Sequence, residues 1–163
     1  MGKQPSILDF STTDLSKEIA SKEEIRKYNS QRFEMEMLDG ILYEDSKTRV
    51  CVAYQDVSSD AFWVRGHMPG FPLMPGVLMC ECAAQAASYV ASKEVCLPED
   101  YIVGLGGLDG VKIRGSVRPG DRLLVVARLE SVRHNTLLVS FEAVVNGEVV
   151  AEGKIRGIGF RKE

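Results

Sequence analysis

The segment from Gly76 to Ser92 limits the possible folds of this chain more than any other part of it. Its only charged residue is Glu81, and no proline or further glycine interrupts it. A helix over Val77–Lys93, of about four to five turns, carries apolar side chains on all of its sides. A helix that is apolar all round is buried all round. We therefore predict that the rest of the chain wraps around this helix.

The remaining residues predict strands and turns. Asn146-Gly147 is a strong hairpin signal, because both turn residues need positive φ. A single helix among strands that are mostly linked by hairpins indicates an α+β fold with one antiparallel sheet. A sheet wrapped around one long central helix is the hot-dog arrangement. The predicted strands are Phe33–Leu38, Arg49–Asp56, 101–108, 111–118, 122–132, 136–145 and 148–160.

The chain has 163 residues, which suits a single domain. We expect an N-terminal extension over 1–21, with mobile first ten residues and a short surface helix capped within Ser11–Asp14, and the hot-dog domain over 22–163. The content of 45% hydrophobic residues excludes disorder, and the net charge of −3 argues against nucleic acid or an anionic membrane as partner. Neither a membrane span nor a secretory signal is evident, so we expect a cytoplasmic protein.

The cysteines predict no metal site. Cys51, Cys80, Cys82 and Cys96 contain no CxxC pair, and residues two apart on a helix point to nearly opposite sides. We interpret all of them as buried, reduced thiols that act as small apolar residues.

Glu81 is the first candidate for chemistry. Burial in an apolar helix favours the neutral form of a carboxyl group and raises its pKa, which suits a general acid. The alternative is a structural glutamate paired with an arginine or with the backbone. His67 lies fourteen residues earlier in a loop rich in proline and glycine, where an imidazole could act as a base. His134, at a predicted hairpin tip, is given no role.

The helix start supplies a third group. Pro75-Gly76 suits a helix N-terminus, where free backbone N–H groups point outward at the positive end of the helix dipole. Gly76 has no side chain to block a ligand, so its N–H could hold a carbonyl oxygen that is becoming an enolate. A base, an acid and an oxyanion donor together suit the loss of water from a compound with a carbonyl group.

The sequence GHMPGFPLMPGVLMCECAAQ, residues 66–85, closely resembles the signature of the (3R)-hydroxyacyl-[acyl-carrier-protein] dehydratases of type II fatty acid synthesis. That family carries its catalytic His and Glu at the same spacing. Similarity extends over about 22–160 and includes Arg32 and Asp39, Lys112–Arg114 and the turn Val117–Asp121.

This resemblance implies dehydration of (3R)-3-hydroxyacyl-ACP to trans-2-enoyl-ACP without a cofactor or metal. His67 would take the C2 proton, the Gly76 N–H would polarise the thioester carbonyl, and Glu81 would protonate the leaving hydroxyl. Gln85, one helical turn after Glu81, could orient its carboxyl group. The resemblance also implies a homodimer, often a hexamer of three dimers, with His67 and Glu81 of each site on different subunits.

Some residues depart from the family pattern. Phe71 stands where arginine is frequent, and Met68 replaces a phenylalanine. Glu34 and Glu36 stand where proline and leucine are usual; they either solvate one strand face or alter the acyl tunnel or the assembly.

The acidic acyl carrier would need a basic docking patch, because the chain itself is slightly negative. The densest candidates are Lys112, Arg114, Arg118 and Arg122, the first three on one face if the strand there is unbroken. The alternative is an ordinary solvated strand, with Arg114 structural. Two other functions stay open for the chain: a hot-dog acyl thioesterase and a non-catalytic acyl-carrier-binding subunit.

Overall fold

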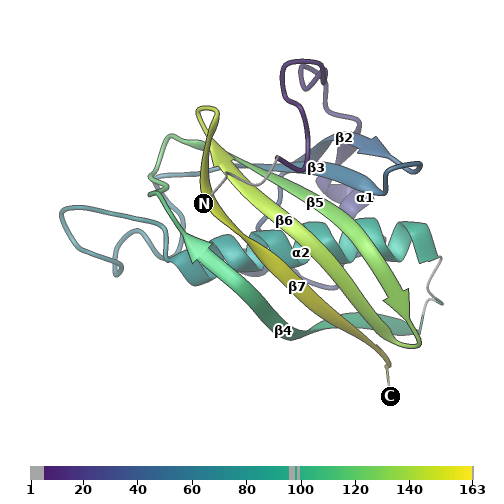
Figure 1. The fold of residues 1–163 in the computed structure, drawn as a ribbon. Helices are drawn as coiled ribbons and strands as arrows, with labels where there is room; N and C mark the ends of the chain where they lie inside the picture. The colour runs from purple at the N-terminus through teal and green to yellow at the C-terminus, as the bar shows by residue number, and fades with distance from the viewer. Residues whose placement is uncertain (1–5, 96–97, 99, 163) are drawn as a thin grey trace.

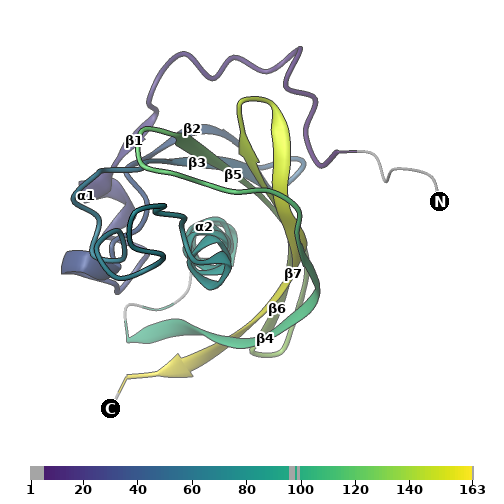
Figure 2. The ribbon, with the colours of Figure 1, turned by 90° about the vertical axis from the view of Figure 1, so that its left-hand side faces the viewer.

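A computed structural model describes residues 6–95, 98 and 100–162, which form a curved antiparallel sheet around one long helix (Figures 1 and 2). The described strands form a 7-stranded sheet in the order β1-β2-β3-β5-β6-β7-β4. The elements are β1 (Ala20–Ser21), α1 (Lys22–Ile25), the 3-10 helix η1 (Phe33–Met35), β2 (Gly40–Asp45), β3 (Val50–Asp56), α2 (Gly76–Val95), β4 (Tyr101–Ile113), β5 (Arg122–Arg133), β6 (Thr136–Val145) and β7 (Glu148–Arg161).

The long helix is where the sequence predicts it. In Figure 2 the sheet curves around α2, so the predicted hot-dog fold is confirmed. Small side chains such as Ala83 and Ala86 are fully buried and bring the helix close to the concave face of the sheet. Among the described residues no helix is long and apolar enough to cross a membrane.

The predicted strand over Phe33–Leu38 is wrong. Phe33 has φ 56°, which a strand does not allow, and η1 occupies this place instead. The backbone groups that a neighbouring strand would use are bound by a side chain of the central helix. Gln85 Nε2 donates to Met35 O at 2.7 Å, and Gln85 Oε1 accepts from Met37 N at 3.0 Å.

The two predicted strands over 101–108 and 111–118 are one strand that ends earlier. β4 continues to Ile113, and its pairing with β7 shifts register between Asp109 and Lys112. Gly110 lies there with φ 59°, so the glycine allows a bulge within the strand. Past Ile113, both Arg114 N and Gly115 N donate to Val150 O, which ends the regular ladder.

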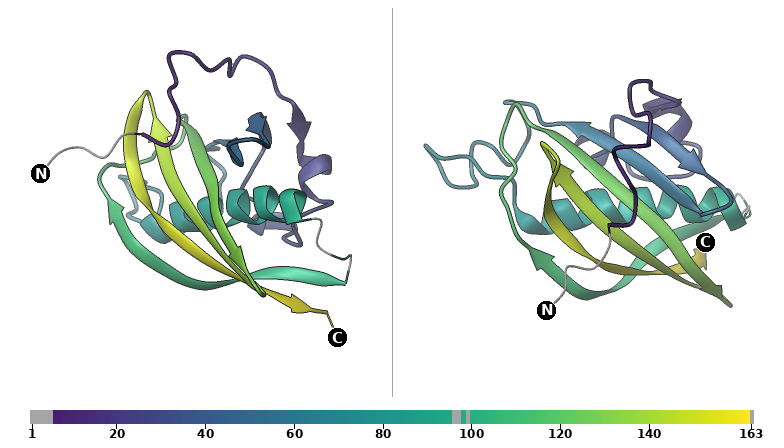
Figure 3. Two further views of the ribbon diagram at one scale, coloured as in Figure 1. Left: turned by 45° about the vertical axis from the view of Figure 1, so that its right-hand side comes forward. Right: turned by 45° about the horizontal axis from the view of Figure 1, so that its top comes forward.

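The N-terminal segment runs across the outer face of the sheet (Figure 3). Ile7, Leu8, Phe10 and Leu15 pack against a second apolar cluster around Val50, Val52 and Val126. Within the segment, Ser11–Asp14 cap no helix; α1 begins after Ser21, whose hydroxyl accepts from Glu24 N. Residues 1–5 lie outside the described residues, and the mobility of the first ten stays a prediction.

Three of the cysteines are buried free thiols, as predicted: Cys51, Cys80 and Cys82. Burial raises the pKa of Cys51 to about 12 and also raises the pKa of Cys82. These thiols therefore stay protonated at neutral pH, whereas Cys96 lies outside the described residues.

Candidate active site

His67 lies in the loop between β3 and α2, residues 57–75, which projects past the N-terminal end of α2 (Figure 1). Two buried side chains, Trp63 and Met74, anchor the loop to the core. Trp63 O accepts from His67 N at 2.7 Å, and Met74 N donates to Val117 O at 2.8 Å. The histidine backbone is therefore fixed although the chain there is irregular.

The His67 ring is oriented by a single strong contact. Its Nδ1 lies 2.6 Å from Leu73 O, and a carbonyl oxygen can only accept a hydrogen bond. Nδ1 therefore carries the proton in the neutral ring, which leaves the lone pair on Nε2. A neutral imidazole in this tautomer can take a proton from a substrate through Nε2.

Gly76 begins α2 directly after this loop. Among the described residues no acceptor lies within hydrogen-bond reach of the Gly76 N–H, as expected for the first turn of a helix. A Cβ atom at this position would lie 3.1 Å from Ile113 Cγ1, which is closer than ordinary packing. The absence of a side chain thus allows β4 to approach the helix start.

Glu81 is half-buried on α2 and bound by the next turn of the same helix. Gln85 Nε2 donates to Glu81 Oε1 at 2.8 Å, the contact that the spacing suggests. Because Oε1 accepts this bond, the acid proton of a neutral Glu81 belongs on Oε2. Gln85 itself is only 2% exposed and is held by Met35 and Met37 as described above.

A pocket opens beside Glu81 between α2 and the sheet. From the helix, Ala84, Ala87 and Ser88 line it together with Glu81, and Gln31 lies at the same opening. The wall on the sheet side is apolar or glycine: Val103, Gly104, Leu137, Val139, Ile155 and Gly157. A second, more open pocket shares Glu81 and Gln31 and reaches Arg32 and Met35. The carboxyl group therefore borders a space whose walls suit an aliphatic chain.

One chain leaves part of α2 uncovered, contrary to the expected burial on all sides. Val77 is 74% exposed, and Glu81 and Ala84 on the same helix face are only half-buried. β4 is the edge strand of the sheet and carries the exposed side chains Leu105, Leu108 and Ile113. His67 lines neither of the two pockets beside Glu81, so the chain does not bring these two groups into one of them.

The predicted common strand face of Lys112, Arg114 and Arg118 is not formed. The strand breaks after Ile113, and two of the four candidate docking cations are engaged in ion pairs: Arg114 with Glu152 and Arg122 with Asp56, each at 2.6 Å. Arg118 follows the break and its guanidinium lies 4.1 Å from the centroid of the Phe71 ring. Phe71, one of the departures from the family pattern, thus stacks against a cation.

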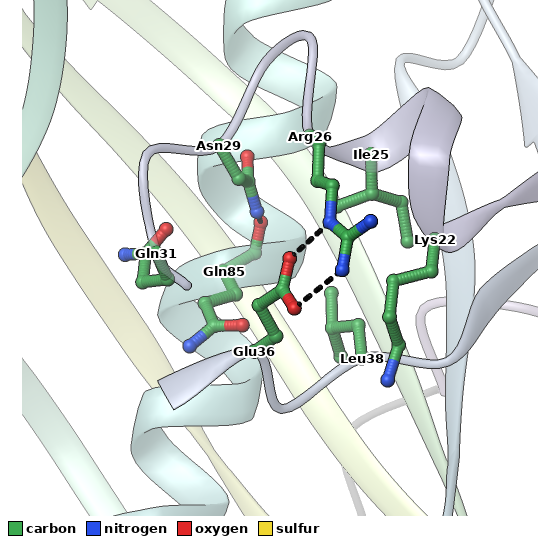
Figure 4. A pocket seen from close by; sticks show the side chains of 8 residues that line it. All are labelled: Lys22, Ile25, Arg26, Asn29, Gln31, Glu36, Leu38 and Gln85. Carbon is green, nitrogen blue, oxygen red and sulfur yellow. Dashed lines mark hydrogen bonds and ion pairs between the residues drawn. The ribbon is translucent and has the colours of Figure 1, made fainter. Parts of the chain in front are cut away.

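Sequence reasoning missed the partner of Glu36. Arg26, at the end of α1, binds the Glu36 carboxylate through two hydrogen bonds, at 2.5 and 2.9 Å (Figure 4). In the sequence, only the opposite charges of Arg26 and Glu36 indicated this pair, because the two residues are ten positions apart and share no regular element. The alternative that the acidic side chains only solvate a strand face is therefore wrong for Glu36, whereas Glu34 is exposed.

Comparisons with known proteins agree with this fold. Residues 29–154 match the FabA-like domain family, so the chain belongs to the FabA-like family. It is 34% identical over 131 residues to the 3-hydroxyacyl-[acyl-carrier-protein] dehydratase FabZ of Polynucleobacter necessarius, covering 80% of this chain and 87% of the relative. It is 32% identical to the FabZ dehydratase of Chlamydia trachomatis serovar L2, covering 90% and 97% of the two chains.

Solved structures share the fold at lower identity. The dehydratase heterocomplex ApeI:P of Xenorhabdus doucetiae superposes with a TM-score of 0.69 at 17% identity, covering 85% of this chain and 91% of that one. A thioesterase of Haemophilus influenzae superposes with a TM-score of 0.56 at 15% identity, covering 75% and 78%. Dehydratases and thioesterases thus share this architecture, and the fold alone does not separate them.

Proposed function

We propose that this chain dehydrates (3R)-3-hydroxyacyl-ACP to trans-2-enoyl-ACP in fatty acid biosynthesis. The observation that carries the proposal is the hydrogen bonding of its two proton-transfer groups. His67 Nδ1 is bound to Leu73 O, which leaves the ring lone pair on Nε2, and Gln85 holds Glu81 at Oε1, which leaves Oε2 free to carry a proton. A base and an acid in these states are what the elimination of water requires. Relatives named for this reaction match most of the chain.

The reaction follows from three groups. His67 Nε2 takes the C2 proton, and the electron pair of that bond moves into the thioester carbonyl, whose oxygen becomes an enolate oxygen. The Gly76 N–H and the helix dipole stabilise this oxygen. When the double bond forms between C2 and C3, the C3 hydroxyl leaves with the proton of Glu81 as water. A proton passing from His67 to Glu81 by way of solvent restores the enzyme.

The site is composed of two subunits in this proposal. His67 comes from one protomer and Glu81 from the other, in a homodimer that can assemble further into a hexamer. Support comes from the uncovered face of α2 at Val77 and from the apolar edge strand β4. An exposed, apolar edge strand is suited to pairing with another strand, and a C2 axis would give two equal sites.

The partner is an acyl carrier protein, and the cytoplasm is the compartment that fits the reduced thiols. Of the docking cations, Arg118 and Lys112 carry this part of the proposal. Both are exposed, and neither is in an ion pair with another described residue.

One turnover assay separates the three candidate functions. Purified protein is incubated with a 3-hydroxyacyl thioester while the enoyl product and free thiol are followed. Enoyl product identifies a dehydratase, and free thiol identifies a thioesterase. If neither product forms, the chain is a binding subunit. We expect His67→Ala and Glu81→Gln each to lower dehydration about 10²–10⁴-fold. Near-normal turnover in either variant would contradict the mechanism.

Complementation tests the shared site. Random exchange between His67→Ala and Glu81→Gln protein makes half of the dimers mixed, each with one intact site. Activity should therefore return to about a quarter of wild type. Persistent inactivity after verified exchange would place both residues of a site in one subunit.

A further inference from the structure

The stretch Met35–Met37 connects an ion pair to the carboxyl group of Glu81. The carbonyl of Met35 and the N–H of Met37 bind the two ends of the Gln85 amide. Glu36, between them, binds Arg26 (Figure 4). Gln85 in turn donates to Glu81 Oε1. Arg26 is thus connected to Glu81 through the side chain of Glu36, the backbone of its two neighbours and the amide of Gln85.

The ion pair is well placed to fix this stretch. The side chain of Glu36 is 12% exposed, and both of its oxygens accept hydrogen bonds from the same guanidinium. The bond from Arg26 lowers the pKa of Glu36, so the carboxylate is charged at neutral pH. Arg26 is itself tied down, because its N–H donates to Lys22 O in α1 and its carbonyl accepts from Arg32.

The backbone also decides which end of the Gln85 amide faces Glu81. Oε1 of Gln85 is occupied by the Met37 N–H, so the NH2 end is directed to Met35 O and to Glu81. If the stretch 35–37 moved, the amide could turn or swing, and Glu81 would lose a donor that holds one of its oxygens. Residues 33–38 form no strand ladder that could replace the ion pair.

We propose that Arg26 and Glu36 are positioning residues for dehydration, which fix the direction of the Glu81 carboxyl group through Met35–Met37 and Gln85. This inference rests on the proposed function, in which Glu81 is the acid. It assigns a role to the glutamate that stands where the related enzymes usually have leucine.

The test compares Glu36→Gln and Arg26→Gln with the matched control Glu34→Gln. Glu34 is exposed directly before this stretch, so its substitution removes a charge without removing the ion pair. We expect kcat for dehydration to fall about tenfold in the first two variants, because small misplacements of a catalytic group cost up to about 10²-fold. KM should change less than about twofold, since the lost interaction acts only in the transition state. The control should match wild type.

A conservative variant and a coupling experiment separate positioning from general damage. Arg26→Lys keeps the charge with fewer donors and should restore part of kcat. In a Gln85→Met background, Glu36→Gln should lower kcat less than about twofold further, because the relay is already broken. Circular dichroism and the melting temperature show whether each variant is folded at the assay temperature. If Glu36→Gln is unfolded there, kcat of Arg26→Gln and of Arg26→Lys tests the same ion pair.

The outcomes distinguish this inference from the proposed function. If Glu81→Gln abolishes turnover while folded Glu36→Gln and Arg26→Gln keep full kcat, the positioning role is wrong and the function stands. Losses that multiply in the Gln85→Met background would also overturn it, since Glu36 would then act by another route. If Glu81→Gln retains turnover, the assigned mechanism itself fails.

Discussion

Replacing Gln85 by Met should destabilise the fold by an amount that follows from its contacts. Methionine keeps the length of the side chain but has no strong donor or acceptor. Met37 is 2% exposed, so its N–H would lose its partner in the interior at a cost of about 1–3 kcal/mol. Met35 is 43% exposed, and water can reach its carbonyl more easily, so that bond contributes only about 1 kcal/mol.

The total of about 3 kcal/mol corresponds to a melting temperature lower by about 6–12 °C for a chain of this size. Thermal unfolding followed by circular dichroism measures it, at one fixed protein concentration because assembly also shifts the midpoint. Gln31→Met is the matched control. Gln31 Oε1 is buried without a hydrogen-bond partner among the described residues, so this substitution should leave the midpoint unchanged or raise it. Equal losses in the two variants, or no loss for Gln85→Met, would refute the reasoning.

Three more predictions follow from individual contacts. Gly76→Ala should lower kcat/KM for dehydration, because its Cβ meets Ile113 Cγ1 at 3.1 Å, and Ile113→Ala should restore part of the loss in steady-state assays. Arg26 lowers the pKa of Glu36 from its usual 4.5, so the ion pair stabilises the fold above pH 4.5 and this contribution is lost as the pH falls further. In acid denaturation, the stability of Glu36→Gln should therefore fall less steeply with pH than that of wild type. Arg118→Glu should weaken use of carrier-linked substrate, most at low salt, and spare a short carrier-free thioester; equal losses with both would argue against docking.

The parts of the fold that the sequence predicts well have long, regular patterns. The continuous apolar run predicts the helix α2, and the strands β3, β5, β6 and β7 lie within a few residues of the predicted ranges. Asn146 and Gly147 have φ 51° and 80°, the left-handed values that their turn requires. In these cases local preference and tertiary packing favour the same structure.

One failure occurs where a distant side chain overrides a local pattern, and another where a glycine permits a bulge. Residues 33–38 alternate as a strand does, yet the amide of Gln85 takes the backbone groups that a ladder needs. That contact spans about fifty residues, and periodicity in a short window cannot report it. In β4, Gly110 permits a bulge where sequence reasoning placed a break between two strands.

The site candidates show the same division between local and distant information. The resemblance and the spacing identify Glu81 and Gln85, and the structure places them in contact because both lie on one helix. His67 lies on a different element, and no pattern along the chain gives its distance to Glu81. The helix does contain one indirect signal, since a helix that is apolar all round must be covered all round. One chain leaves Val77 uncovered on the face of Glu81, beside an edge strand that is also apolar and exposed. The helix face that lacks a covering layer is therefore the face that carries Glu81, and the proposed site on that face lacks a histidine. A second copy of the chain would cover the face and supply its His67.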